Sequence, residues 1–252
     1  MNDFKEWNTT FDRLRYKYET HAIFRDWLDF AVDQFTIPSF EPSFKYGRYK
    51  KEELQLFQEL FEAWIQSMDR ELETRDYYDF LGEWWENDQN MTNKFRAQFF
   101  TPIDVCRLMC ELTLADMGDC DDVLCMNDPT CGSGRFAIVH HHYRPQDKFM
   151  LQDLDEYACK MAVLNMVLHG MTGVVSYMNT LTREVFACWQ VRTDYLFPIP
   201  CIIPYGVDLD AACTILPQSS EKMVKVPPVA PIQEQTGNMT SLDRWIKQKE
   251  EE

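Results

Sequence analysis

Hydrophobic side chains recur at three- and four-residue steps through the first 95 residues of the chain. This spacing places them on one face of a helix and predicts amphipathic helices, with a loop at Pro38 and Pro42. Aromatic stripes of this kind are typical of helix packing, so we assign them no chemistry. The stripes are Phe4, Trp7, Phe11, Leu14 and Tyr18, then Phe24, Trp27, Leu28 and Ala31, then Leu54, Phe57, Leu60, Phe61, Trp64 and Met68, and last Tyr77, Phe80, Leu81 and Trp84.

Another helix is predicted to begin at Thr101-Pro102, because threonine is a good N-cap and proline suits the first helical position. Cys106 and Cys110 lie one turn apart on this helix. A zinc site would need a second pair of ligands at a usable spacing, and none follows, so we favour a structural role for both. The predicted buried side consists of Val105, Leu108, Met109, Leu112 and Leu114.

From about residue 122 the pattern changes to short apolar runs that alternate with amphipathic segments. Such alternation predicts a parallel sheet with right-handed crossovers. Residues 195–205 are apolar but contain three prolines, which only an edge strand tolerates. The other predicted elements are strand 122–127, helix 134–143, strand 148–152, helix 155–170 and strand 174–178.

Together these patterns predict an α/β protein with three regions. Residues 1–95 form a helical domain and residues 96–215 form a Rossmann-like α/β domain. Residues 216–252 are proline-rich and polar, which predicts a flexible tail that ends in a short helix.

The run Asn127–Phe136, with the sequence N-D-P-T-C-G-S-G-R-F, joins a predicted strand to a predicted helix. An open parallel sheet holds nucleotide-like ligands at this kind of turn. Gly132 and Gly134 allow positive φ and close approach of a ligand to the backbone. The third glycine of a dinucleotide fingerprint is missing, so the neighbouring segments must identify the ligand.

The formal net charge of −16 argues against a chain that binds DNA by itself, because phosphate contacts dominate such binding. Arg13, Arg15, Lys17 and the run Lys45–Lys51 are candidates for a local basic groove, although solvated surface positions are the favoured interpretation. We therefore expect a protein partner or a homo-oligomer. The chain has no apolar run of about 18 residues and no signal peptide, and its nine cysteines are scattered, which predicts a reduced, cytoplasmic protein without a membrane span.

Three adjacent histidines, His140-His141-His142, suggest a metal site. Adjacent side chains on a helix point in different directions, so they cannot all bind one ion. We favour a solvated helix end, predict no metal site, and expect His169 to pack at the end of its own helix.

Four segments around residues 96–182 occur in an order that resembles the adenine-N6 DNA methyltransferase family, in particular the modification subunits of type I restriction-modification systems. They are Gln98-Phe99-Phe100-Thr101-Pro102, Asp128-Pro129-Thr130-Cys131-Gly132-Ser133-Gly134, Asp153 with the helix end Asn165-Met166-Val167-Leu168-His169-Gly170, and Met178-Asn179-Thr180-Leu181. The resemblance implies S-adenosyl-L-methionine as cofactor and DNA methylation as activity.

The resemblance also implies roles for particular residues. Asp128 would accept from the ammonium of the cofactor, Asp153 from its ribose hydroxyls, and Asn179 would contact the adenine. Thr101 and nearby backbone N–H groups would suit its carboxylate. The alternative for Asp128 and Asp153 is capping of the following helices, and Thr101 can also be a simple N-cap. The implied cofactor-binding set is Phe100, Thr101, Asp128, Pro129, Gly132, Gly134, Asp153, Leu154, Asn179 and Leu181.

The family's catalytic motif, [DN]-P-P-[FY], has no match in this chain. The nearest segment is Ile202-Ile203-Pro204-Tyr205, so Pro204 and Tyr205 are the catalytic candidates. An isoleucine stands where a flipped adenine needs a hydrogen-bond acceptor. Another acceptor, such as Asn179 or Asp194, would then have to serve. The chain also ends before the family's last strands would fit, so we expect a methyltransferase domain that is incomplete at its C-terminus.

Two functions follow. The first is a DNA adenine-N6 methyltransferase that retains the cofactor site and is active alone or with a partner. The alternative is a catalytically inactive cofactor-binding or interaction protein. The stretch Met239–Ile246 resembles short peptides that dock on DNA sliding clamps, although a terminal helix that docks on the protein itself is favoured.

Overall fold

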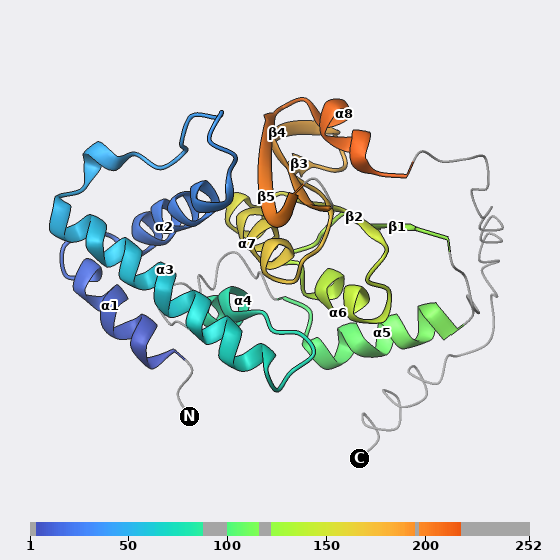
Figure 1. Cartoon of the computed structure of the whole chain (residues 1–252), viewed down its shortest axis with the longest axis horizontal. Coiled ribbons are helices and arrows are strands. Elements are labelled where there is room, and N and C mark those ends of the chain that lie inside the picture. Colours follow the sequence, from blue (N-terminus) through green and yellow to red (C-terminus); the bar gives the residue numbers. More distant parts are fainter. Residues whose placement is uncertain (1–3, 88–99, 116–121, 195–196, 218–252) are drawn as a thin grey trace, which may run out of the picture. The chain divides into compact units, whose positions relative to one another are not determined.

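The computed structural model describes residues 4–87, 100–115, 122–194 and 197–217. All described helices and strands belong to one compact unit, Met1–Pro217, and Figure 1 shows their arrangement. The predicted tail 216–252 lies outside the described residues from residue 218 onward, and the boundary at residues 95 and 96 stays a prediction. Among the described residues, no helix is both long and apolar enough to cross a membrane.

The predicted N-terminal helices are present. They are α1 (Lys5–Arg15), α2 (Thr20–Phe35), α3 (Lys51–Leu72) and α4 (Phe80–Asn87), with a short 3-10 turn, η1 (Tyr46–Arg48). Their aromatic stripes point inward, since Trp7, Trp27 and Trp64 are all fully buried. Trp27 packs edge-on against both of the others, with ring centroids 4.6 and 5.6 Å apart. The stripes are therefore core.

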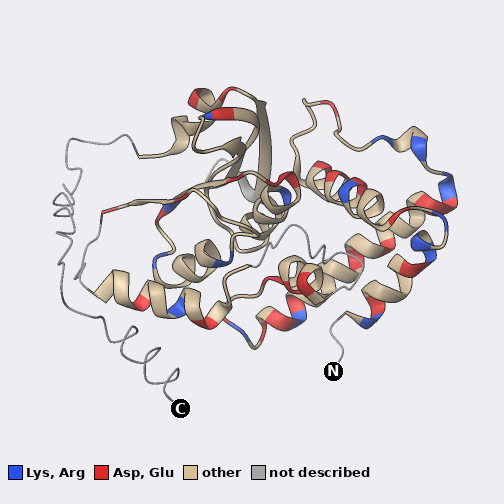
Figure 2. Cartoon of the chain, turned by 180° about the vertical axis from the view of Figure 1, so that it is seen from behind, with Lys and Arg blue, Asp and Glu red and all other residues tan. Residues whose placement is uncertain are grey.

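Most basic candidates near the N-terminus are engaged in ion pairs. Arg13 contacts Glu59, Arg15 contacts Asp12, Lys17 contacts Glu53 and Arg48 contacts Asp26. Figure 2 shows blue and red segments interspersed along the ribbons of these helices. These pairs favour the interpretation as ordinary surface positions over a basic groove, because each positive charge has a carboxylate beside it.

The α/β part of the prediction is confirmed, as a mixed sheet. Strands β1 (Cys125–Asp128), β2 (Lys148–Asp153) and β3 (Gly173–Asn179) run parallel, with α6 (Arg135–Tyr143) and α7 (Glu156–Leu168) as crossovers. Strands β4 (Glu184–Asp194) and β5 (Phe197–Gly206) continue the sheet antiparallel. The strand order is β1-β2-β3-β4-β5, so the proline-containing β5 is an edge strand, as expected.

The two faces of the sheet are covered differently. Figure 1 shows α6 and α7 on one side and α8 (Leu209–Ala212) on the other. A short 3-10 turn, η2 (Cys213–Ile215), follows α8. Lys148 Nζ donates to the Ile215 carbonyl (2.6 Å), and Gln190 Nε2 donates to the Ala212 carbonyl (2.8 Å). These bonds hold the last described segment against β2 and β4.

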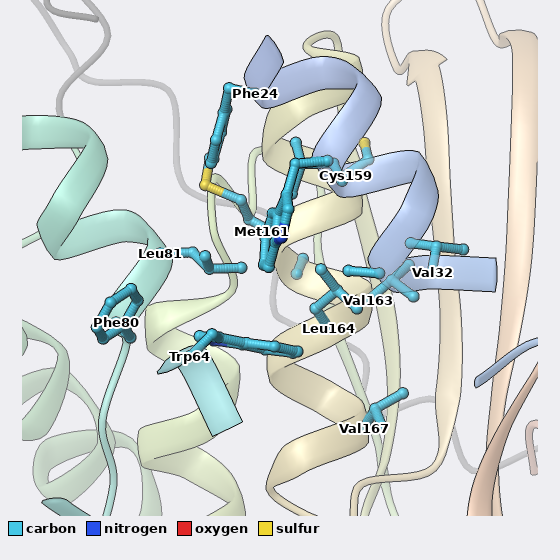
Figure 3. Packing of buried hydrophobic residues seen from close by; sticks show 14 of the residues in the cluster. Phe24, Val32, Trp64, Phe80, Leu81, Cys159, Met161, Val163, Leu164 and Val167 are labelled. Carbon is cyan, nitrogen blue, oxygen red and sulfur yellow. The ribbon is translucent and has the colours of Figure 1, made fainter. Parts of the chain in front are cut away.

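Helix α7 is buried along almost its whole length, from Ala158 to Val167. A helix that is apolar on all sides must be covered on all sides. The sheet covers one side, and Figure 3 shows side chains of α2, α3 and α4, among them Phe24, Trp64 and Leu81, around another. The N-terminal helices and the sheet thus share one hydrophobic core.

Helix α5 (Ile103–Ala115) corrects one prediction. Four of the five side chains expected to be buried are exposed, among them Leu108 at 54% and Leu112 at 65% of full exposure, whereas Leu114 is partly buried. Cys106 and Cys110 are fully buried instead and pack with Val139 of α6. The helix has two apolar stripes, and its contact with α6 selects the one with the smaller side chains. Burial raises the pKa of the Cys106 thiol to about 11 and that of Cys110 to about 12, so both are core thiols.

The tight pairing of β2 and β3 yields a first prediction. A Cβ added at Gly173 would lie 2.2 Å from the backbone oxygen of Phe149, which cannot move without breaking the sheet. We expect Gly173→Ala to lower the free energy of unfolding by about 1–3 kcal/mol, measured by urea denaturation. Gly47→Ala is the control, because no atom lies within 4 Å of its added Cβ. Equal stability of the two variants would contradict this account.

Candidate cofactor-binding site

The loop between β1 and α6 has the conformation that its glycines predict. Gly132 and Gly134 have φ angles of +55° and +87°, in the region that glycine adopts without strain. Gly134 is the N-cap of α6, and a Cβ there would meet the Cβ of Ala162 on α7 at 3.3 Å. The Gly134 N–H donates to the Cys131 carbonyl (2.9 Å). Both glycines are thus required by the shape of the loop.

Asp128 ends β1 and begins this loop. Its carboxylate accepts from the Thr130 N–H at 3.1 Å, which folds the first turn of the loop. Burial raises the pKa of Asp128, and the negative charge of Asp153 raises it further. The carboxylate is half-buried, so it retains an open side for a ligand.

Asp153 ends β2 and joins two loops. Its Oδ2 accepts from the Gly132 N–H and its Oδ1 from the Asp155 N–H, both at 2.9 Å. Burial raises the pKa of Asp153, although these N–H groups oppose the rise. Helix α7 is capped by Asp155 and α6 by Gly134. The alternative that Asp128 and Asp153 serve as helix caps is therefore wrong.

The two carboxylates lie at the carboxyl ends of adjacent parallel strands. Among the described residues, neither Asp128 nor Asp153 has a cationic side chain in an ion pair. A carboxylate offers about four acceptor positions, and backbone N–H groups take one at Asp128 and two at Asp153. The site is therefore suited to a ligand that brings positive charge and hydroxyl donors.

The carboxyl end of β3 lies at the same edge of the sheet as those of β1 and β2. Asn179 Oδ1 accepts from the Leu181 N–H (3.1 Å) and the Thr182 N–H (3.2 Å), which closes the turn after the strand. Its amide oxygen is thus occupied by backbone donors. Leu154 and Leu181 follow β2 and β3 and are 61% and 94% exposed. The edge combines polar strand ends with exposed apolar side chains.

The remaining predicted residues differ in exposure. Phe100 is buried, and a Cβ at Gly132 would lie 2.7 Å from its ring, so the ring packs directly against the loop. Thr101 and Pro129 are exposed. Helix α5 begins at Ile103, two residues after Thr101, so the expected helix start is displaced slightly.

Pro204 and Tyr205 lie apart from the cofactor-site candidates at β1, and their catalytic role stays a prediction. Both lie on β5, and the sheet order places β2, β3 and β4 between that strand and β1. The cause is the short connection 180–183, which folds β4 back as a hairpin on β3. A return to the free edge of β1 would require a longer crossover.

The expectation of a solvated helix end is wrong for His140, which is buried, whereas His142 is exposed. His140 Nε2 lies 2.8 Å from a carboxylate oxygen of Asp147, whereas His142 is 3.9 Å from Asp76. The His169 ring contacts the Asn165 carbonyl through Nδ1 (2.8 Å) and accepts from the Tyr78 N–H through Nε2 (3.3 Å). Within the described ranges, no group of three or more metal-binding side chains occurs.

The sequence analysis gives no role to two residues beneath the glycine loop, Asp79 and Asn165. Asp79 and Asn165 are fully buried and hydrogen bonded to each other (2.8 Å), although 86 residues separate them. A signal was present, because each is a lone polar residue in an apolar stretch, and buried polar groups require partners. Which partners they have depends on the fold.

A comparison with protein families shows to which family the chain belongs. The family described as N-6 DNA Methylase matches residues 76–218, more than half of the 252. The chain belongs to the N-6 DNA methylase family. No curated protein and no solved structure matches it. The match includes every residue of the candidate site, as well as Asp79, and begins after α3.

The buried histidines make the stability of the protein sensitive to acid. Burial lowers the pKa of His141 to about 4, and it also lowers the pKa of His169. An unfolded histidine has a pKa of about 6.5, so below that pH the unfolded chain binds protons that the folded chain does not. The free energy of unfolding should therefore fall as the pH drops from about 6.5 toward 4.

Urea denaturation between about pH 7 and pH 5 tests this effect. We expect His141→Gln to weaken the loss of stability on acidification. His142→Gln is the matched control, since the neighbouring His142 side chain is 38% exposed. The same pH dependence in wild type and His141→Gln would contradict the assignment.

Proposed function

We propose that this member of the N-6 DNA methylase family binds S-adenosylmethionine at the carboxyl ends of β1, β2 and β3. The observation that carries the proposal is the contact between Asp153 Oδ2 and the Gly132 N–H (2.9 Å), which joins the end of β2 to the glycine loop beside Asp128. The cofactor carries an ammonium, a sulfonium and two ribose hydroxyls. Each of these groups is positively charged or donates a hydrogen bond, so each interacts favourably with the carboxylates of Asp128 and Asp153.

Each strand end has a role in this proposal. Asp128 accepts from the ammonium, and Asp153 accepts from the ribose hydroxyls through positions that its two backbone bonds leave open. Asn179 has its amide oxygen occupied, so its NH2 group donates to the adenine. Leu154 and Leu181 supply apolar contacts to the ring from their exposed positions. When bound, the cofactor supplies a methyl group on a positively charged sulfur.

We further propose that methyl transfer to adenine N6 in DNA requires a partner polypeptide. The amine of the target base needs an acceptor and an aromatic platform. Pro204 and Tyr205 lie on the edge strand β5, and the side-chain oxygen of Asn179 already accepts a hydrogen bond from a backbone N–H. Asp194 is at the end of β4, next to β5 rather than β1. A separate chain that brings the acceptor would complete the site.

The charge of the chain favours the same proposal. DNA binding needs positive charge, whereas this chain has 41 acidic and 25 basic residues. Four basic candidates of the helical region already pair with carboxylates. A partner with a basic surface would complement both this chain and DNA.

The second candidate is an interaction protein that keeps the cofactor site but transfers no methyl group. The exposed stripe of α5 favours it, because contiguous apolar surface is typical of interaction sites. Isoleucine in place of the motif's acceptor favours it as well. The tail stretch Met239–Ile246, a candidate clamp-binding peptide, lies outside the described residues and stays a hypothesis.

Calorimetric titration with S-adenosylmethionine tests cofactor binding. We expect the wild-type chain to bind, and Asp128→Ala to weaken the affinity about tenfold or more, because one hydrogen bond to a charged group is lost. Asp122→Ala is the control, since this exposed aspartate precedes the same strand. No binding by wild type at millimolar cofactor would refute the proposal.

Tritium transfer from the labelled cofactor to unmethylated DNA separates the two candidate functions. We expect no transfer by the isolated chain, and transfer once a partner with the missing acceptor is added. Incorporation by the isolated chain that disappears in Asp128→Ala would contradict the need for a partner. Binding of the cofactor without transfer under any condition would favour the interaction protein.

A further inference from the structure

A saturated buried carboxylate lies beneath the glycine loop. Asp79 immediately precedes α4 and its side chain has no exposed surface. Its Oδ2 accepts from Ser133 Oγ (2.5 Å) and Arg135 Nε (2.7 Å). Its Oδ1 accepts from the Gly82 N–H (2.9 Å) and Asn165 Nδ2 (2.8 Å). Four donors from three helices and the loop therefore converge on one carboxylate.

This arrangement acts on the loop at its centre. Ser133 stands between the two glycines with positive φ, and its carbonyl also accepts from Asn165 Nδ2 (2.8 Å). A buried charge is tolerated only when it is paired and hydrogen bonded. Asp79 thus has one favourable position, and Ser133 is held to it from below.

A second set of contacts continues from Arg135 to the outer side of the loop. Arg135 Nη2 lies 2.8 Å from Glu86 Oε2, and the guanidinium carbon is 5.5 Å from the centre of the Phe100 ring. Glu86 Oε1 accepts from the Phe100 N–H (3.0 Å). Because Phe100 packs on Gly132, the cluster contacts the loop at two neighbouring residues, Gly132 and Ser133.

Gly82 on α4 makes the close approach possible. A Cβ at this position would lie 2.0 Å from Asp79 Oδ2 and 2.7 Å from Ser133 Oγ. The first turn of α4 therefore has no side chain where the loop meets Asp79. Residues 79–86 and the glycine loop therefore pack closely against each other at this point.

We propose that Asp79 is a positioning residue for the cofactor site: it fixes the glycine loop in its binding conformation without touching the ligand. The helical region is then part of the cofactor site's support. This inference rests on the proposed function for its ligand, S-adenosylmethionine. The effect of Asp79 on the conformation of the loop does not depend on that ligand.

Asp147 provides a matched control for Asp79. It is equally buried, and it also accepts from an arginine, Arg144 (2.8 Å), and from a backbone N–H, that of Leu124 (3.0 Å). It precedes β2, at the end of the sheet opposite to the glycine loop. Replacement of either aspartate by asparagine should lower stability, but only one should affect the loop.

Hydrogen exchange of the full chain without cofactor measures the loop directly. The amides of Cys131, Gly132 and Gly134 are hydrogen bonded within or beside the loop. We expect Asp79→Asn to raise their exchange about tenfold relative to the β3 amides, and Asp147→Asn to leave that ratio unchanged. Equal ratios in both variants would overturn the proposal even if the wild type binds no cofactor.

Calorimetry with S-adenosylmethionine, below the melting temperature of every variant, measures the consequence for the site. We expect about tenfold weaker binding for Asp79→Asn, and wild-type affinity for Asp147→Asn. Ser133→Ala leaves the carboxylate in place and removes one donor, so it tests the same contact should Asp79→Asn fail to fold; its affinity should also fall. Wild-type affinity in Ser133→Ala and in any folded Asp79→Asn would overturn the proposal, whereas absence of binding by wild type would refute the proposed function instead.

Discussion

The burial of α7 on all sides is the constraint on which the rest of the structure depends. Its apolar surface requires the sheet on one side and the N-terminal helices on another. Its two polar side chains in this buried stretch then need partners from those helices. Lys160 pairs with Asp29 of α2 and with Glu156, and Asn165 bonds to Asp79 (2.8 Å). One helix thereby joins the helical region to the edge of the sheet where β1, β2 and β3 end.

The elements defined by local patterns could be predicted from the sequence. Helical stripes, and the strand-turn-helix around Gly132, depend on residues close together in the chain. The buried face of α5 could not, because that helix carries two apolar stripes and its contact with α6 selects between them. Strand β4 could not be predicted either, because the buried Gln190 interrupts its apolar run. The hydrogen bond that satisfies the Gln190 amide goes to the carbonyl of Ala212, 22 residues away.

The candidate site divides in the same way. Asp128, Asp153 and Asn179 could be predicted, because each ends a predicted strand and parallel strands end at one edge. Asp79 could not, since 54 residues separate it from Ser133 and no local pattern connects them. Tyr205 is a catalytic candidate because of its distance along the chain from the other segments. The short connection 180–183 decides the strand order, however, and puts Tyr205 on the edge strand β5.

The same electrostatics that suit the cofactor oppose DNA. Half-buried carboxylates with raised pKa values favour a cationic ligand that removes their mutual repulsion. A phosphate backbone near them meets like charge, within a chain whose net charge is −16. In the proposed function, cofactor binding and DNA binding therefore require opposite potentials, and the net charge of this chain favours the first. The proposed partner would supply the positive charge for DNA binding as well as the acceptor that β5 does not provide.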